Sequence, residues 1–162
     1  MRLNKQREQH ARRALHIEYI TVSEAAKERL GTEVFLSYSR KDGDFARKLN
    51  RTLQESGKTV WFDQESISSG ANFEIELYKG IQNSDNFLFV ISPDSVTSPY
   101  CESEVNYAAQ QGKRMVSVLC RETEPSTLPE ALKFINWIDF AQQDFDKQFP
   151  ELIQTLELDR EH

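Results

Sequence analysis

The sequence has 162 residues, with 20 Lys and Arg against 26 Asp and Glu, and its net charge of −6 does not favour a protein that binds nucleic acid through phosphates. No apolar run reaches the roughly 18 residues that a membrane-spanning helix needs. The basic N-terminus has no apolar segment behind it, so we expect a cytoplasmic protein without a signal peptide or membrane contact. Two cysteines, Cys101 and Cys120, do not suggest a disulfide framework or a metal-binding pair.

Residues 1–31 differ in charge from the rest of the chain. They hold seven basic and four acidic residues, whereas the remainder holds 13 basic and 22 acidic residues. Ser23 can cap a short helix over Glu24–Leu30, and Gly31 can end it. We therefore predict a helical extension over residues 1–31 and a domain over residues 32–158. The extension could be a linker, a helix that binds a partner, or an arm packed on the domain.

Beyond this extension, short apolar runs alternate with amphipathic stretches. The apolar runs predict strands at residues 34–39, 59–62, 86–91, 115–119 and 134–138. The helices between them are predicted to begin at Asp42, near Phe73, at Pro99 after the capping residue Ser98, and near Phe145. The predicted fold class is therefore α/β, a flavodoxin-like doubly wound parallel sheet of about five strands in the order 2-1-3-4-5. Helices flank the sheet, because nearly continuous apolar strands require cover on both faces.

The predicted helix after the third strand carries an acidic residue on its apolar side. Cys101, Glu104, Val105 and Ala108 share one stripe at helical spacing, and Tyr100 lies one turn before the glutamate. A carboxylate on an inward stripe must line a cleft or find a partner, because burying it alone is costly. Glu104 therefore belongs either to a ligand site at the carboxyl ends of the strands or to an ion pair with a lysine or arginine.

Two further segments follow predicted strands. Residues 37–42 combine hydroxyls, a guanidinium and a helix start, which suits an anionic ligand or an ordinary capping turn. Ser92 ends the third strand on the other side of the same switch point. Asp63 and Glu65 enter a Ser/Gly loop that could close over a ligand, contact a protein or simply favour solubility.

Several other classes of site lack their motifs. The sequence has no P-loop, no Rossmann dinucleotide fingerprint and no nucleophile elbow. The three histidines all lie near the termini, at His10, His16 and His162. A metal site or a histidine-based triad in the core is therefore not expected.

Four segments together resemble the sequence boxes of TIR domains (Toll/interleukin-1 receptor homology). Residues 34–39, Val-Phe-Leu-Ser-Tyr-Ser, resemble the first box, and Asp63 with residues 64–72 resembles the entry to the BB loop. Residues 98–104, Ser-Pro-Tyr-Cys-Glu-Ser-Glu, resemble the Trp/Tyr-Cys-x-x-Glu helix motif of the enzymatic branch. Residues 134–137, Phe-Ile-Asn-Trp, resemble the last box. The resemblance covers about residues 32–157, leaves residues 1–31 outside, and is closest to bacterial TIR domains.

The resemblance implies NAD⁺ cleavage between nicotinamide and ribose, with hydrolysis, cyclisation to a cyclic ADP-ribose, or base exchange. It makes Glu104 the catalytic residue and NAD⁺ the substrate, with no cofactor and no metal. The positions that it places at or beside the substrate cleft are Ser37, Tyr38, Ser39, Arg40, Asp63, Glu65, Gly70, Phe73, Ser92, Tyr100 and Cys101. Tyr100 stands where many active members have tryptophan, but a tyrosine can also stack on a ring.

One carboxylate can suffice for this chemistry. The nicotinamide of NAD⁺ is cationic and leaves as a neutral base, so the leaving group needs no general acid, unlike that of a glycosidase. The resemblance therefore favours a signalling or defence enzyme, activated when TIR domains assemble through the BB loop, residues 64–72. The alternatives are a TIR scaffold that only binds other TIR domains and a nucleotide sensor without turnover.

Overall fold

The computed structural model describes residues 31–62 and 71–158, with side chains in the second range described from residue 74 onward. The helix predicted over Glu24–Leu30 and most of the predicted BB loop lie outside these residues. The helices and strands are β1 (Thr32–Ser37), η2 (Arg40–Asp42), α2 (Gly43–Glu55), β2 (Val60–Phe62), α3 (Ala71–Gln82), β3 (Ser84–Ile91), α4 (Pro99–Gln110), β4 (Arg114–Leu119), η3 (Pro125–Thr127), η4 (Glu130–Leu132), β5 (Ile138–Asp139) and α5 (Phe145–Leu158).

The sheet has five strands in the order β2-β1-β3-β4-β5, as predicted. Strand β1 pairs in parallel with β2, β3 with β4, and β4 with β5. From the central neighbours β1 and β3, the chain continues outward in opposite directions, to β2 and to β4. This switch point brings Ser37, the last residue of β1, to the same edge of the sheet as Ser92, which follows β3.

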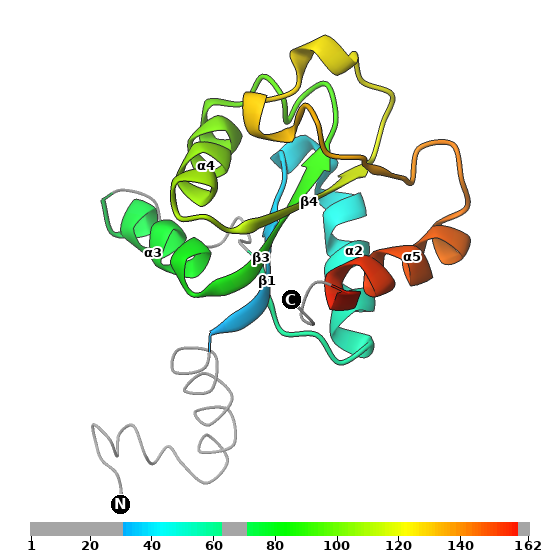
Figure 1. Cartoon of the computed structure of the whole chain (residues 1–162), viewed down its shortest axis with the longest axis horizontal. Helices are drawn as coiled ribbons and strands as arrows, with labels where there is room; N and C mark the ends of the chain where they lie inside the picture. The colour runs from blue at the N-terminus through cyan, green and yellow to red at the C-terminus, as the bar shows by residue number, and fades with distance from the viewer. Residues whose placement is uncertain (1–30, 63–70, 159–162) are drawn as a thin grey trace, which may run out of the picture. The chain divides into compact units, whose positions relative to one another are not determined.

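Two helices cover each face of the sheet (Figure 1). Helices α2 and α5 pack on one face, and α3 and α4 pack on the other. Side chains alternate between the faces along a strand, so Val34 and Leu36 of β1 contact the first pair of helices and Phe35 contacts the second. Burial on both faces explains why the strands are apolar almost throughout.

Helix α4 begins as its sequence predicts. The Oγ of Ser98 accepts a hydrogen bond of 3.2 Å from the backbone N–H of Cys101, which satisfies one of the unpaired donors of the first turn. Pro99 occupies the first helical position, where its missing N–H costs nothing. Gly112 lies beyond the end of the helix with a φ of 70°, which favours glycine. The predicted inward stripe is confirmed, since the buried residues of α4 are Cys101, Glu104, Val105 and Ala108.

The predicted fifth strand over residues 134–138 is wrong in its extent. Strand β5 contains Ile138 and Asp139 alone, paired with the end of β4. The residues before it follow the short helix η4, and Phe134 is 92% exposed, whereas Trp137 packs against the core under α3 and α4. An apolar run can cover a core without joining the sheet, and hydrophobicity alone does not separate the two cases.

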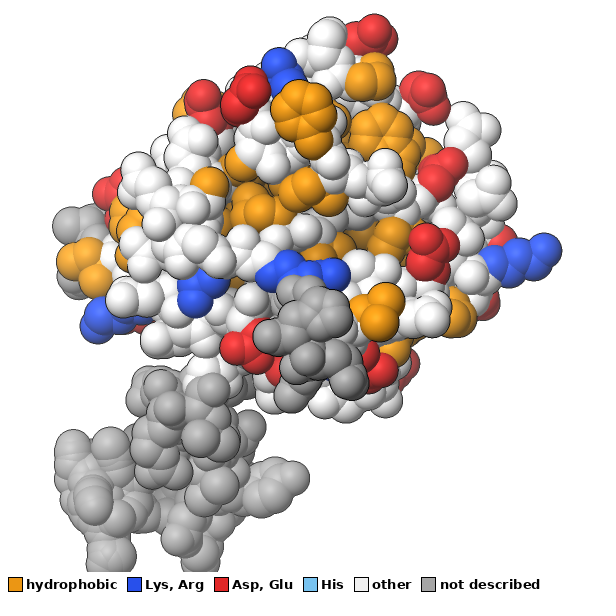
Figure 2. Space-filling model, in the orientation of Figure 1, with side chains coloured by type: hydrophobic (Ala, Val, Ile, Leu, Met, Phe, Trp, Pro, Cys, Tyr) orange, Lys and Arg blue, Asp and Glu red, His pale blue; other side chains and the backbone are white. Residues whose placement is uncertain are grey.

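The surface combines scattered charges with local hydrophobic groups. Figure 2 shows hydrophobic side chains gathered in the upper half of one face, with acidic side chains mostly around its margin. Large exposed hydrophobic side chains include Ile75 and Tyr100, which are 50% and 64% exposed. Within the ranges that the structure describes, no helix has the length and apolar character needed to cross a membrane.

Candidate active site

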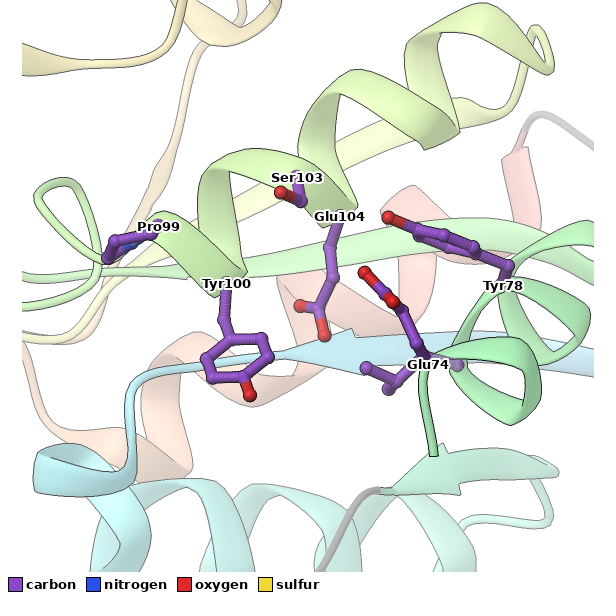
Figure 3. Close-up of a pocket in the computed structure, with 7 residues that line it drawn as sticks. Glu74, Tyr78, Pro99, Tyr100, Ser103 and Glu104 are labelled. Carbon is purple, nitrogen blue, oxygen red and sulfur yellow. The ribbon is translucent and has the colours of Figure 1, made fainter. Parts of the chain in front are cut away.

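A cavity of about 160 Å³ opens between helices α3 and α4. Its lining consists of Glu74, Leu77 and Tyr78 from α3 and Pro99, Tyr100, Ser103 and Glu104 from α4. Figure 3 shows the carboxylates of Glu74 and Glu104 and the ring of Tyr100 directed into the space between the two helices. Helix α4 follows the carboxyl end of β3, so the cavity lies at the edge of the sheet where doubly wound folds bind ligands.

Glu104 is the buried acidic group of this cavity, with 8% of its surface exposed. The hydroxyl of Ser37, at the end of β1, donates a hydrogen bond of 2.6 Å to its Oε1. A hydrogen bond to an ionised acceptor is short and strong, so it holds the carboxylate in one direction. The contact joins residues 67 positions apart and connects α4 to the centre of the sheet.

Two aromatic side chains, Tyr78 and Tyr100, also line the cavity. Tyr100 is largely exposed at the mouth of the cavity, one turn before Glu104. Tyr78 stacks on Tyr107 with 4.6 Å between ring centroids, and this contact holds its ring against α4. Burial raises the pKa of Tyr78, and the negative charges of Glu74 and Glu104 raise it further. Its hydroxyl therefore remains protonated at neutral pH and can donate a hydrogen bond.

Cys101 is buried in the core next to the cavity and does not line it. Burial raises the pKa of its thiol to about 12, with a further increase from the negative charge of Glu104. The thiol therefore stays neutral near pH 7 and is a poor nucleophile. In the described part of the chain, no three His, Cys, Asp or Glu side chains lie close enough together to hold a metal ion.

A second polar cluster joins the loops that follow β1, β3 and β4. Asp42 accepts hydrogen bonds from Ser92 Oγ at 2.5 Å and from Arg121 Nε at 2.8 Å. Arg121 also donates from Nη2 to Asp94 at 2.5 Å. These two hydrogen bonds raise the pKa of Arg121, so it stays charged. Ser92 is fully buried and connects these loops, and it is not among the residues that line the cavity.

The other predicted site residues have varied positions. Tyr38 stacks on Phe62 with 5.2 Å between centroids, and Ser39 caps η2 by accepting a 3.2 Å hydrogen bond from the Lys41 N–H. Arg40 is exposed on η2. Of the predicted residues, the structure brings Tyr100 and Glu104 together in the cavity, with Ser37 behind them. Those that lie outside the described residues are Asp63, Glu65, Gly70 and the side chain of Phe73.

Glu74 and Tyr78 are among the five lining residues that the predicted site does not include. They lie four positions apart on α3, so they share one face of the helix beside the buried Leu77. The pattern of an acid and an aromatic flanking an apolar stripe could have indicated them. Sequence reasoning also missed the pairing of Arg121 with Asp42, for which a charged residue two positions after a buried strand was the available signal.

The three-layered α/β fold, with an acidic and aromatic cavity at the carboxyl ends of its strands, defines a doubly wound domain with a site for a small ligand. The chain belongs to the TIR domain family, whose sequence profile matches residues 34–153. The family resemblance stated from the sequence motifs is thereby confirmed.

The chain has relatives among bacterial and archaeal proteins. It is 29% identical over 75 residues to the 2' cyclic ADP-D-ribose synthase AbTIR of Acinetobacter baumannii, a match that covers 46% of this chain and 28% of that protein. It is 25% identical over 103 residues to the 2' cyclic ADP-D-ribose synthase BtTIR of Bacteroides thetaiotaomicron, covering 63% and 36%. A probable synthase of the same type, TcpO of Methanobrevibacter olleyae, matches at 29% identity over 44% of this chain and 21% of that protein. The matches thus span only 21% to 36% of these relatives' lengths.

Solved structures share the fold. The TIR domain of the Toll-related receptor TRR-2 from Hydra magnipapillata superimposes with a TM-score of 0.66 at 19% identity, over 77% of this chain and 98% of that one. A metazoan TIR-STING receptor from C. gigas gives a TM-score of 0.64 at 25% identity, over 77% and 39%. These likenesses confirm the predicted fold class.

Proposed function

We propose that this domain cleaves the bond between nicotinamide and ribose in NAD⁺. The observation that carries the proposal is Glu104, a buried carboxylate that Ser37 orients at 2.6 Å within a cavity at the switch point of a TIR fold. The names of the bacterial relatives, which are cyclic ADP-ribose synthases, support the same substrate.

The proposed reaction needs one well-placed negative charge. As the bond between C1′ and the ring nitrogen breaks, its electron pair moves to nicotinamide, which leaves as a neutral base. Positive charge then develops on the ribose, and Glu104 stabilises it or holds the ribose hydroxyls. Water attacks to give ADP-ribose and a proton, or a hydroxyl of the substrate attacks to give a cyclic product. Tyr100 would stack on a ring of the substrate at the mouth of the cavity.

Assembly with other TIR domains is part of the proposal. The BB loop, residues 64–72, is proposed to contact a neighbouring copy and to complete the cleft beside Glu104. Activity is then expected to rise when the domain is concentrated or clustered, in keeping with a signalling or defence role.

The experiment is to incubate the domain with NAD⁺, free or clustered on beads, and to follow nicotinamide release by chromatography. Replacing Glu104 with Gln is expected to lower kcat by about 10²–10³-fold, the loss typical when one electrostatic stabiliser of a transition state is removed. The matched control is Glu102→Gln, because Glu102 is exposed on the same helix and does not line the cavity.

Two results would contradict the proposal. Turnover that persists in Glu104→Gln would show that another group carries the reaction. No nicotinamide release under any clustering condition would favour the scaffold function instead. Separating the linear from the cyclic product by mass, which differs by one water, identifies the attacking group.

A further inference from the structure

The cavity contains a second carboxylate, from a different helix. Glu74 lies in the first turn of α3 and lines the same cavity as Glu104 of α4. In Figure 3 both carboxylates point into the space between the helices, near Tyr78. Among the described residues that form this lining, none is basic. The two carboxylates therefore make the lining acidic, and a lining of one charge sign favours a ligand of the opposite sign.

The pKa of Tyr78 also responds to the negative charges of both carboxylates. Beyond the effect of burial, Glu74 raises the pKa of Tyr78 most strongly, and Glu104 raises it next. Since both carboxylates affect the phenol of Tyr78, both lie near the cavity that Tyr78 lines. Glu74 is exposed, so water screens its charge, whereas Glu104 is buried and its charge is screened less.

The size and the walls of the cavity suit one ring. Its volume is about 160 Å³, close to the roughly 150 Å³ of an engineered cavity that takes up benzene. Tyr78 and Tyr100 supply aromatic surface on either helix, and aromatic faces attract cations. Two carboxylates together with two tyrosines form the chemistry expected for a flat, positively charged ring.

We propose that Glu74 is a specificity-determining residue that selects the positively charged pyridinium ring of the substrate over neutral rings of the same shape. This inference rests on the proposed function, since it names which part of the dinucleotide the cavity recognises. It predicts that the oxidised dinucleotide binds and that the reduced dinucleotide, whose nicotinamide is neutral, is discriminated against.

The kinetic consequence differs from that of losing Glu104. The ring is cationic in the bound substrate and loses its charge as the bond breaks, so Glu74 stabilises the ground state at least as well as the transition state. Glu74→Gln is therefore expected to raise KM about fivefold, the size of an ion pair at contact distance in water. Its effect on kcat is expected to be smaller, the reverse of the pattern for Glu104→Gln.

A binding experiment separates this inference from catalysis. The whole chain is titrated by NMR with 1-methylnicotinamide, which is cationic and has no ribose to cleave, and with neutral nicotinamide. The wild-type chain is expected to bind the cation more tightly than the neutral ring, and Glu74→Gln is expected to lower this preference about fivefold, while Glu104 maintains the rest. Glu76→Gln is the matched control, because Glu76 is exposed on the same helix, does not line the cavity and changes the net charge equally.

The outcomes are distinct from those that test NAD⁺ cleavage. An unchanged preference in Glu74→Gln, a lowered preference in Glu76→Gln, or absence of binding by both rings would overturn the inference. If the preference behaves as expected but NAD⁺ is not turned over, the proposed function fails while Glu74 remains the cation-selecting residue. If turnover depends on Glu104 but no preference exists, only the role of Glu74 is wrong.

Discussion

The hydrogen bond between Ser37 and Glu104 permits a quantitative prediction. Ser37→Ala removes the hydroxyl that donates to Oε1 at 2.6 Å, and both residues are buried, with 1% and 8% of their surfaces exposed. A hydrogen bond to a charged group contributes about 1.5–3 kcal/mol. If that orientation is needed in the transition state, the loss corresponds to about a 10- to 150-fold decrease in kcat. KM should change much less, because Ser37 is not among the residues that line the cavity.

The assay combines NAD⁺ turnover with urea unfolding of the same preparations. Ser37→Ala is expected to lower the free energy of unfolding by a similar amount, about 1.5–3 kcal/mol, since the buried carboxylate loses a donor. The matched control is Ser117→Ala, because Ser117 is a buried strand serine whose Oγ has no hydrogen-bond partner among the described residues. That variant should retain both activity and stability.

Unchanged kcat in Ser37→Ala, with normal folding, would refute the idea that this hydrogen bond orients the catalytic carboxylate. An equal loss of kcat in Ser117→Ala would indicate instead that activity responds to any change in the buried sheet.

Three further predictions concern stability and reactivity. Arg121→Met should lower the free energy of unfolding in urea by about 2 kcal/mol, because it leaves the carboxylate of Asp42 buried without its charged partner. Breaking a fully buried ion pair usually costs about 3–5 kcal/mol, and the loss here is smaller because the side chain of Arg121 is 45% exposed. Gly80→Ala would place a Cβ 2.7 Å from the indole of Trp61. This overpacking should destabilise the fold by about 1–3 kcal/mol, more than the gain in helix propensity of up to about 1 kcal/mol. The thermal midpoint of unfolding should therefore fall. Because the pKa of Cys101 is raised to about 12, a smaller fraction of its thiol is deprotonated at pH 8 than for an ordinary cysteine. Mass spectrometry should therefore show that native Cys101 resists iodoacetamide until urea is added. Unchanged urea stability in Arg121→Met, an unchanged thermal midpoint in Gly80→Ala, or rapid alkylation of native Cys101 would contradict the corresponding prediction.

Much of the fold follows from patterns that are local in the chain. The sequence predicts β1 and β3 because strands buried on both faces are apolar almost throughout. It predicts the start of α4 because Ser98 and Pro99 occupy the positions that a helix start favours. The fifth strand was misplaced because residues 134–138 are apolar for a different reason. Ile135 and Trp137 pack against the core beside η4, whereas Phe134 is exposed. Of this run, only Ile138 joins the sheet.

The candidate site was predictable only in part. The stripe on α4 identifies Glu104 as an inward acid, and the family motif makes it the expected catalytic residue. The sequence does not predict a role for Glu74, because an exposed glutamate near a helix start usually only stabilises the helix terminus. The resemblance places Ser92 at or beside the substrate cleft, and the structure shows its hydroxyl donating to Asp42. Its contact with the substrate stays a prediction.

The order of strands and helices and the inward position of Glu104 on its helix can be predicted from the sequence, because hydrophobic periodicity and capping act over a few residues. The donation from Ser37 to Glu104 across 67 positions and the position of Glu74 in the same cavity follow from the tertiary structure. Parallel crossovers bring such distant segments together. The side chains that then come into contact depend on how α3 and α4 pack on the sheet. A sequence pattern within one segment does not predict that packing.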